Sequence, residues 1–195
     1  MIKVIIFASN VFGNSEESYK LFAKEFNPNE EDLDRINKKY FLPAKKGRYS
    51  KKELIDKLSK ELNTTKKHFL ENAKDCGNLL KTDKQIINLV KKLKKRYKLV
   101  SVSNTNELFA SLKIEKEQYS SFHLSILSYK IKSLRPEMKT YKEILRRLKI
   151  KGEECLYIDS KEKMLVPARK LEMGTILYKN NSQLLRDLEK DGIKV

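Results

Sequence analysis

Hydrophobic and polar residues follow two spacing patterns along this chain. Short apolar runs that end in small polar residues predict buried strands, whereas apolar residues spaced three or four positions apart predict helices. The predicted strands read KVIIFA, KLVSVSN, FHLSILS, ECLYID and GTILYK. From residue 98 onward, each of these strands is followed by a helical pattern. Strands that alternate with helices predict a parallel, doubly wound (Rossmann-like) α/β sheet.

Residues 15–80 separate the first predicted strand from the others, and their pattern is helical. One helix face is formed by Tyr19, Phe22, Ala23 and Phe26. A later helix begins with Ser50 and Glu53, whose spacing predicts a capping box. The sequence therefore predicts a core domain of residues 1–14 plus 81–195, interrupted after its first strand by a helical insertion.

Small or polar residues stand where the predicted strands end, at the edge of a parallel sheet that carries ligand chemistry. They are Ala8 to Asn10 after the first strand, Ser103 and Asn104 after the second, Ser128 leading to Arg135 after the third, and Asp159 after the fourth. None of Ala8, Ser9 and Asn10 is a good nucleophile, acid or base at such a position. The predicted strand ends are thus arranged as in an active site, but the end of the first strand carries no catalytic side chain.

In order and spacing, these strand ends closely resemble the motifs of the haloacid dehalogenase (HAD) superfamily. The stretch LVSVSNTNE is similar to the second motif of that family, and FHLSILSYKIKSLRPEMKTYKEIL to the stretch that holds the third. The stretch CLYIDSKEKMLVPARKLEMGTILYKN is similar to the fourth motif with the helix and strand after it. The resemblance covers essentially the whole chain, and it implies that residues 15–80 form the helical cap of that family.

The resemblance implies a chemistry in which the first strand ends in DxD, with a nucleophilic first aspartate and a second that acts as general acid and base. In this chain those positions hold Ala8 and Asn10. The paired acids of the fourth motif are Asp159 and Ser160, so one carboxylate remains, and the third-motif lysine is Arg135. Magnesium prefers anionic oxygen ligands. We therefore expect degenerate motifs with no catalytic residue and a lost magnesium site, hence no metal and no cofactor.

Several of these residues have two interpretations. Ser103, Asn104 and Arg135 are candidates for binding an anion. Ser103 and Asn104 could instead hold a loop, and Arg135 could pair with Asp159. Asp159 itself is either a remnant metal ligand or a cap for the helix that begins at Lys161, and we favour the cap.

Two functions follow from the resemblance. The leading hypothesis is a catalytically inactive HAD-like protein that acts by binding. The alternative is a phosphatase-like hydrolase with an unorthodox active site, in which Ser9 is the nearest hydroxyl that could act as a nucleophile. The side chain after a strand-end position tends to point the opposite way, and no histidine lies near Ser9 in the sequence. We therefore favour a structural role for Ser9.

Charge is the strongest feature of the composition, with 43 Lys and Arg against 26 Asp and Glu and a net charge of +17. Residues 38–151 carry a net charge of +20, whereas residues 1–37 carry −3 and residues 152–195 are neutral. Such an excess favours polyanionic partners, so we expect RNA or a ribonucleoprotein first and an acidic protein second. The candidate contacts are Lys91, Lys92, Lys94, Lys95, Arg96, Arg146 and Arg147. Only eight of the 43 are Arg, so a lysine-rich solvated surface is the competing interpretation.

The remaining residues predict neither a metal site nor a membrane segment. Cys76 and Cys155 lack metal-ligand spacing and are expected to be buried thiols in a reducing cytoplasm. His68 and His123 are isolated, which meets no ligand count. No apolar run approaches the roughly 20 residues of a membrane span, and the apolar stretch at the start is too short for a signal peptide. We therefore expect a cytoplasmic protein with no membrane partner.

Overall fold

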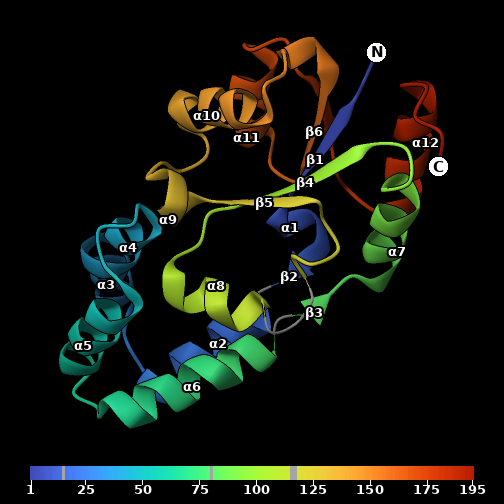
Figure 1. Cartoon of the computed structure of the whole chain (residues 1–195). Helices are drawn as coiled ribbons and strands as arrows, with labels where there is room; N and C mark the ends of the chain where they lie inside the picture. Colours follow the sequence, from blue (N-terminus) through green and yellow to red (C-terminus); the bar gives the residue numbers. More distant parts are fainter. Residues whose placement is uncertain (15, 80, 115–117) are drawn as a thin grey trace.

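The structure, a computed structural model, describes residues 1–14, 16–79, 81–114 and 118–195 (Figure 1). Residues 15 and 80, at which the predicted insertion begins and ends, lie outside the described residues. Of residues 14, 16–19, 113 and 114 only the backbone is described, so the predicted place of the Tyr19 side chain lies outside the description as well.

A five-stranded parallel sheet forms the centre of the structure. Its strands run in the order β5 (Leu124–Leu127), β4 (Lys98–Ser103), β1 (Val4–Ala8), β6 (Cys155–Asp159) and β7 (Gly174–Leu177). All four pairings between neighbours are parallel. The predicted doubly wound α/β fold is therefore confirmed, with the first strand of the chain in the middle of the sheet.

Helices cover both faces of the sheet because successive side chains of a strand point to opposite sides. Ile5 and Phe7 of β1 pack with one hydrophobic cluster that includes residues of α7 (Lys84–Leu93) and α12 (Asn181–Lys190). Val4 and Ile6 pack with another that includes residues of α10 (Met138–Leu148) and α11 (Glu162–Arg169). Figure 1 shows the two helix pairs on either side of the sheet.

The predicted insertion contains a run of helices after β1. They are α2 (Glu16–Phe26), α3 (Glu30–Ile36), the π-helix η1 (Asn37–Phe41), α4 (Leu42–Lys45), α5 (Lys51–Glu61) and α6 (Lys66–Asn78). Ser50 and Glu53 form the predicted capping box at the start of α5. The helices share a third cluster with Leu108 and Leu112 of α8 (Glu107–Ile114), so their core extends onto a helix outside the insertion. The division of the chain into two domains stays a prediction.

The sequence pattern does not predict several short elements of the structure. β2 (Gly13–Asn14) and β3 (Lys81–Thr82) pair antiparallel and bring the two ends of the insertion together. The residues directly after β1 form the one-turn helix α1 (Ser9–Phe12), and α9 (Ser128–Ile131) follows β5 directly. The short 3₁₀-helix η2 (Gly152–Glu154) precedes β6. Elements of two to four residues are too short to show a period.

Close contacts join the insertion to the end of β5. Gly47, just after α4, has a φ of +68°, and a Cβ at this position would lie 2.3 Å from the carbonyl oxygen of Tyr129 in α9. The Lys46 Nζ atom lies 2.7 Å from Glu137 Oε1 in the loop before α10. Glycine is therefore required at position 47 both by backbone conformation and by space.

Gly47→Ala is expected to lower the free energy of unfolding by about 2 kcal/mol or more. Alanine would have to adopt the left-handed backbone conformation, and its Cβ would overlap the Tyr129 carbonyl oxygen. Gly192→Ala is the matched control, because Gly192 has a φ of +72° but nothing within 4 Å of its Cβ position. The control should lose about 1 kcal/mol, from the backbone alone. Denaturant unfolding measures both variants, and equal losses would contradict a role for the Tyr129 contact.

Candidate functional site

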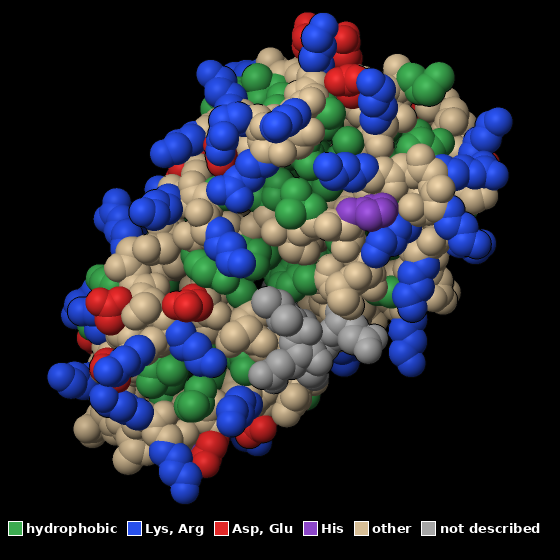
Figure 2. All heavy atoms as spheres, in the orientation of Figure 1, with side chains coloured by type: hydrophobic (Ala, Val, Ile, Leu, Met, Phe, Trp, Pro, Cys, Tyr) green, Lys and Arg blue, Asp and Glu red, His purple; other side chains and the backbone are tan. Residues whose placement is uncertain are grey.

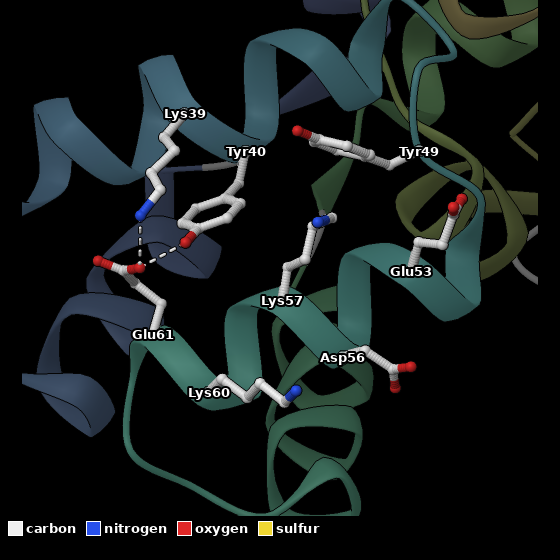
Figure 3. Close-up of a pocket in the computed structure, with 8 residues that line it drawn as sticks. All are labelled: Lys39, Tyr40, Tyr49, Glu53, Asp56, Lys57, Lys60 and Glu61. Atoms are coloured by element: carbon white, nitrogen blue, oxygen red, sulfur yellow. Dashed lines mark hydrogen bonds and ion pairs between the residues drawn. The ribbon is translucent and has the colours of Figure 1, made fainter.

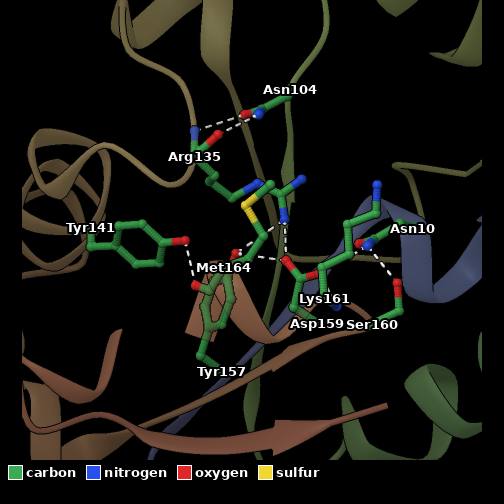
Figure 4. A network of polar contacts seen from close by, with 9 residues as sticks. All are labelled: Asn10, Asn104, Arg135, Tyr141, Tyr157, Asp159, Ser160, Lys161 and Met164. Carbon is green, nitrogen blue, oxygen red and sulfur yellow. Dashed lines mark hydrogen bonds and ion pairs between the residues drawn. The ribbon is translucent and has the colours of Figure 1, made fainter. Parts of the chain in front are cut away.

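The candidate site lies at the carboxyl edge of the sheet, where the predicted motif positions meet. β1 ends at Ala8, β4 at Ser103 and β6 at Asp159. All three residues are completely buried. Figure 4 shows the side chains of Asn10 and Arg135 converging on Asp159 from α1 and from the loop before α10.

The Asp159 carboxylate is the centre of this site. Its Oδ2 atom accepts a hydrogen bond of 2.6 Å from Arg135 Nη1, and its Oδ1 atom accepts one of 2.8 Å from Asn10 Nδ2. Oδ1 also accepts from the backbone N–H of Lys161 at 3.1 Å, and Tyr157 adds a long contact of 3.4 Å to Oδ2. Both oxygens of the remaining motif carboxylate are thus occupied by donors of the chain itself.

Arg135 is almost completely buried, with 7% of its surface exposed. Its Nη1 atom also donates to the Tyr157 hydroxyl at 3.1 Å. Burial opposes the charge of the guanidinium, but Tyr157 and Asp159 outweigh it and raise the pKa of Arg135 above its usual value. Arg135 is therefore a permanent cation beside Asp159.

Asn104 fixes the backbone of Arg135 rather than presenting a free amide. Its Oδ1 atom accepts from the Arg135 N–H at 3.0 Å, and its Nδ2 atom donates to the Arg135 carbonyl at 2.9 Å. Both ends of the Asn104 amide are used, so the loop-holding interpretation applies to it. Of the three predicted anion-binding residues, Ser103 and Arg135 retain side-chain atoms without a hydrogen-bond partner: Ser103 Oγ and Arg135 Nε.

Asn10 joins the two positions of the fourth motif. Its Nδ2 atom donates to Asp159 and, at 2.6 Å, to Ser160 Oγ. Its Oδ1 atom is buried without a hydrogen-bond partner. Asn10 therefore lies where the resemblance implies a catalytic carboxylate, but here it acts as a donor to the one carboxylate that is left.

The two open interpretations of Asp159 and Arg135 are decided by this geometry. Arg135 pairs with Asp159. Asp159 accepts from the Lys161 N–H, as expected for a cap at that residue, although α11 itself begins at Glu162 with Lys161 as its N-cap residue. Asp159 binds the N–H of that N-cap residue and not an N–H of the first helical turn. Its strongest partners come from elsewhere in the chain.

Three tyrosines around the site were not identified from the sequence. Tyr157 lies two residues before Asp159 on the same strand, and this spacing of two could have placed both on one face. The Tyr141 ring packs against that of Tyr157, with centroids 5.4 Å apart, and its hydroxyl donates to the Met164 carbonyl at 2.6 Å. Burial raises the pKa of Tyr119 to about 12, and the Ser103 hydroxyl lies near enough to oppose that shift. Neither the Tyr119 nor the Ser103 hydroxyl has a partner at hydrogen-bonding geometry.

The residues at this edge do not fit a magnesium ion. Of Ala8, Asn10, Asp159 and Ser160, only Asp159 is a carboxylate, and its oxygens already accept from Arg135 and Asn10. Magnesium requires several oxygen ligands in near-octahedral geometry. Across the part of the chain that the structure describes, no three His, Cys, Asp or Glu side chains form a group that could hold a metal.

Ser9, the hydroxyl considered above as an unorthodox nucleophile, is the first residue of α1, directly after β1. Within the described ranges, its side chain makes no hydrogen bond to a histidine or a carboxylate that could activate it. The two histidines have other partners, since His68 Nε2 lies 2.7 Å from Glu25 and His123 Nδ1 accepts from the Leu99 N–H. The two cysteines, Cys76 and Cys155, are buried and not joined in a disulfide.

The basic candidate residues divide into two groups. Lys91, Lys92, Lys95 and Arg96 are exposed and Lys94 is half-buried, at the end of α7 and in the turn after it. Arg146 and Arg147, in contrast, both lie 2.7 Å from Glu143 and together lower the pKa of its carboxyl to about 2. Among described residues, no carboxylate forms an ion pair with the α7 group. Figure 2 shows Lys and Arg side chains along the edge of the molecule where α7 lies.

Comparison with solved structures places this fold among the HAD-family hydrolases. A HAD family enzyme from Bacteroides thetaiotaomicron superposes with a TM-score of 0.80 at 22% identity, over 95% of this chain and 98% of that one. A HAD-like family hydrolase from Porphyromonas gingivalis gives 0.75 at 19% identity over 100% of both chains. The L-2-haloacid dehalogenase from Xanthobacter autotrophicus gives 0.64 at 16% identity, over 100% of this chain and 85% of that one. The predicted HAD resemblance is thus confirmed at the level of the fold.

Sequence comparison gives shorter matches. A bifunctional epoxide hydrolase from Rattus norvegicus is 34% identical over 88 residues, which are 45% of this chain and 16% of that protein. Its counterpart from Mus musculus is 38% identical over 69 residues, 35% of this chain and 12% of that protein. The chain therefore matches less than a fifth of the length of these curated relatives. No family model matches the chain.

Across the described residues, none of the helices has the length and apolar character needed to cross a membrane.

Millimolar magnesium is expected to leave the protein without a saturable signal in a calorimetric titration, because the single motif carboxylate is held by Arg135 and Asn10. The control variant is Asp159→Asn, which removes that carboxylate. A saturable magnesium site in the native chain that disappears in the variant would contradict this prediction.

Proposed function

We propose that this chain is a HAD-like protein without hydrolase activity that works by binding. The proposal rests on the side chains that occupy the motif positions at the strand ends. Ala8 offers only a methyl group where the resemblance implies a nucleophile, and Asn10 donates to Asp159 where it implies a general acid and base. A covalent mechanism needs both roles. Arg135 holds the remaining carboxylate in a buried ion pair.

The proposal depends on this combination and not on Ala8 alone. The enzyme from Bacteroides thetaiotaomicron has been crystallised with magnesium and inorganic phosphate both as the wild-type protein and as an aspartate-to-alanine mutant. One such change is therefore compatible with bound metal and phosphate in that protein. In this chain Ala8, Asn10 and Ser160 together replace three acids that the resemblance implies, and Arg135 supplies a cation beside the fourth.

The double variant Ala8→Asp/Asn10→Asp is expected to gain phosphatase activity from a native chain that has none, since it restores the nucleophile and the general acid implied by the resemblance. Release of inorganic phosphate from a panel of phosphate esters measures it. Ala8→Asp alone is the matched control and should stay near zero, because it lacks the proton donor. Clear activity in the native chain would contradict the proposal and favour the unorthodox hydrolase.

We further propose that the partner is RNA or a ribonucleoprotein surface, bound by the exposed cations at the end of α7. Five basic side chains, Lys91 to Arg96 without Leu93, lie together with no ion-pair partner among the described residues. Burial and the charges of Lys94 and Lys98 lower the pKa of nearby His123, which agrees with a positive field there. Neutralising several phosphates at once releases counterions and favours binding. An acidic protein is the second candidate partner.

RNA binding should weaken steeply with salt, and changing Lys91, Lys92, Lys94 and Lys95 to Gln should lower affinity at low salt about tenfold or more. Arg146→Gln/Arg147→Gln is the matched control, because Glu143 pairs with both arginines and offsets part of their charge, so this variant should change affinity much less. Filter binding of a generic RNA at two salt concentrations measures both. Equal losses in the two variants, or no binding near physiological salt, would leave these lysines as solvated surface.

We also propose weak binding of an inorganic anion at the sheet edge, supported by the unpartnered Ser103 Oγ and Arg135 Nε atoms. Phosphate at high concentration should raise the melting temperature of the native chain. The Ser103→Ala variant should lose most of that increase, because it removes one of the two buried donors that the anion would meet. A phosphate effect that is unchanged in Ser103→Ala would place the anion elsewhere.

A further inference from the structure

A pocket lies on the helical insertion, between η1 and α5 (Figure 3). In Figure 1, α5 lies on the opposite side of the molecule from α7. Its volume is about 560 Å³, which is within the usual range for sites of small organic ligands. The rings of Tyr40 and Tyr49 line it from one side, and α5 lines it from the other (Figure 3). The pocket shares no residue with the Asp159 site or with the α7 cations, so a ligand bound in it would be independent of the proposed function.

The carboxylates of the pocket are already satisfied. Glu61 accepts from the Tyr40 hydroxyl and from Lys39 Nζ, the latter at 3.2 Å, and it also pairs with Arg35. Asp56 pairs with Lys66 at 2.7 Å. These acids therefore have cationic partners that leave them little capacity to attract a second cation into the pocket.

Glu53 is the third acid of the pocket, and it is used in the capping box. Its Oε2 atom accepts from the N–H and the hydroxyl of Ser50, both at 2.8 Å. These hydrogen bonds, with a smaller contribution from the charge of Lys57, lower the pKa of Glu53. Glu53 thus faces the helix start and forms no ion pair with a lysine of the pocket within the described part of the chain.

Two lysines of the pocket remain without a carboxylate partner at ion-pair distance among the described residues: Lys57 and Lys60. The Lys57 ammonium lies over the Tyr49 ring, 5.0 Å from its centroid. A ring face holds a cation in place without neutralising its charge. Three cations and three carboxylates line the pocket, and Arg35 and Lys66 pair with two of those acids from outside it. The acids of the pocket are thus engaged elsewhere, whereas Lys57 and Lys60 form no ion pair among the described residues and Lys57 is held in position by an aromatic ring.

We propose that this pocket binds a small anionic molecule with a planar ring, of the size and charge of a nucleoside monophosphate. The anionic group would be bound by Lys57 and Lys60 through charge-assisted hydrogen bonds, the strongest contacts that an ammonium makes. The planar part would pack against the wall that carries both tyrosines, where the half-buried Tyr49 supplies apolar ring surface. A bare inorganic anion would use the cations but leave most of the volume empty.

Calorimetric titration of the full chain with AMP, adenosine and inorganic phosphate tests the charge and the ring separately. AMP should bind tighter than either, because adenosine lacks the anionic group and phosphate lacks the ring. Lys57→Gln should weaken AMP binding about tenfold, the usual effect of losing one charge-assisted hydrogen bond. Lys163→Gln, which changes an exposed lysine on α11, is the matched control and should bind like the native chain.

Two further variants test the aromatic wall. Tyr49→Phe keeps the ring under Lys57 and should retain AMP affinity, whereas Tyr49→Leu should lose most of it. Tyr49 is half-buried, so the thermal unfolding of Tyr49→Leu is measured beside its binding. Should that variant not fold, Tyr49→Phe and Lys57→Gln still decide the question. AMP binding no tighter than phosphate binding, or equal affinity in Lys57→Gln and Lys163→Gln, would overturn the proposal.

Discussion

The buried ion pair between Arg135 and Asp159 is the interaction on which the carboxyl edge of this sheet depends. Neither group is more than 7% exposed, so both have lost their hydration. Desolvation of this kind is repaid only when the remaining donors and acceptors find partners. Asn10, Tyr157 and the Lys161 N–H supply them for Asp159. Removing one partner would leave a buried charge, at a cost of about 3–5 kcal/mol.

The ion pair fixes the carboxyl edge of the sheet but does not by itself hold the sheet together. The sheet is held by apolar layers above and below β1, in which Ile5, Ile6 and Phe7 are fully buried. None of those contacts involves a motif side chain beyond Ala8. A carboxylate left alone at such an edge would need a cation, and Arg135 provides one within the chain. Tyr157 is shared by one apolar layer and by the Asp159 site, so the two meet at that residue.

The cations on the surface differ in whether their carboxylate partners lie nearby on the same helix or far along the chain. Glu143 pairs with both Arg146 and Arg147, and the spacings of three and four on one helix predict that pairing from the sequence. The cations at the end of α7 meet no such partner on their own helix. In the insertion, Lys39 pairs with Glu61, which lies 22 positions away and also pairs with Arg35. Which lysines carry uncompensated charge is therefore a property of packing and not of composition.

The sequence by itself determined the elements whose signal is local. The apolar runs predicted the five parallel strands, and the Ser50 and Glu53 spacing predicted a capping box. Strand ends also placed Arg135 and Asp159 at one edge. Periodicity could not show that Arg135 pairs with Asp159, since backbone pattern does not say which rotamer a side chain adopts or what it meets.

Only the tertiary structure decided the roles that depend on partners far along the chain. Asn10 meets Asp159 across 149 positions, and Asn104 holds Arg135 across 31. The β2–β3 pair is too short to carry a period, and the pocket beside Tyr49 exists only once η1 and α5 pack together. The physical reason is that the hydrophobic pattern reports only on neighbouring positions of the chain. Hydrophobic period reports which face of an element is buried, whereas a site is made by side chains that folding brings together from separate elements.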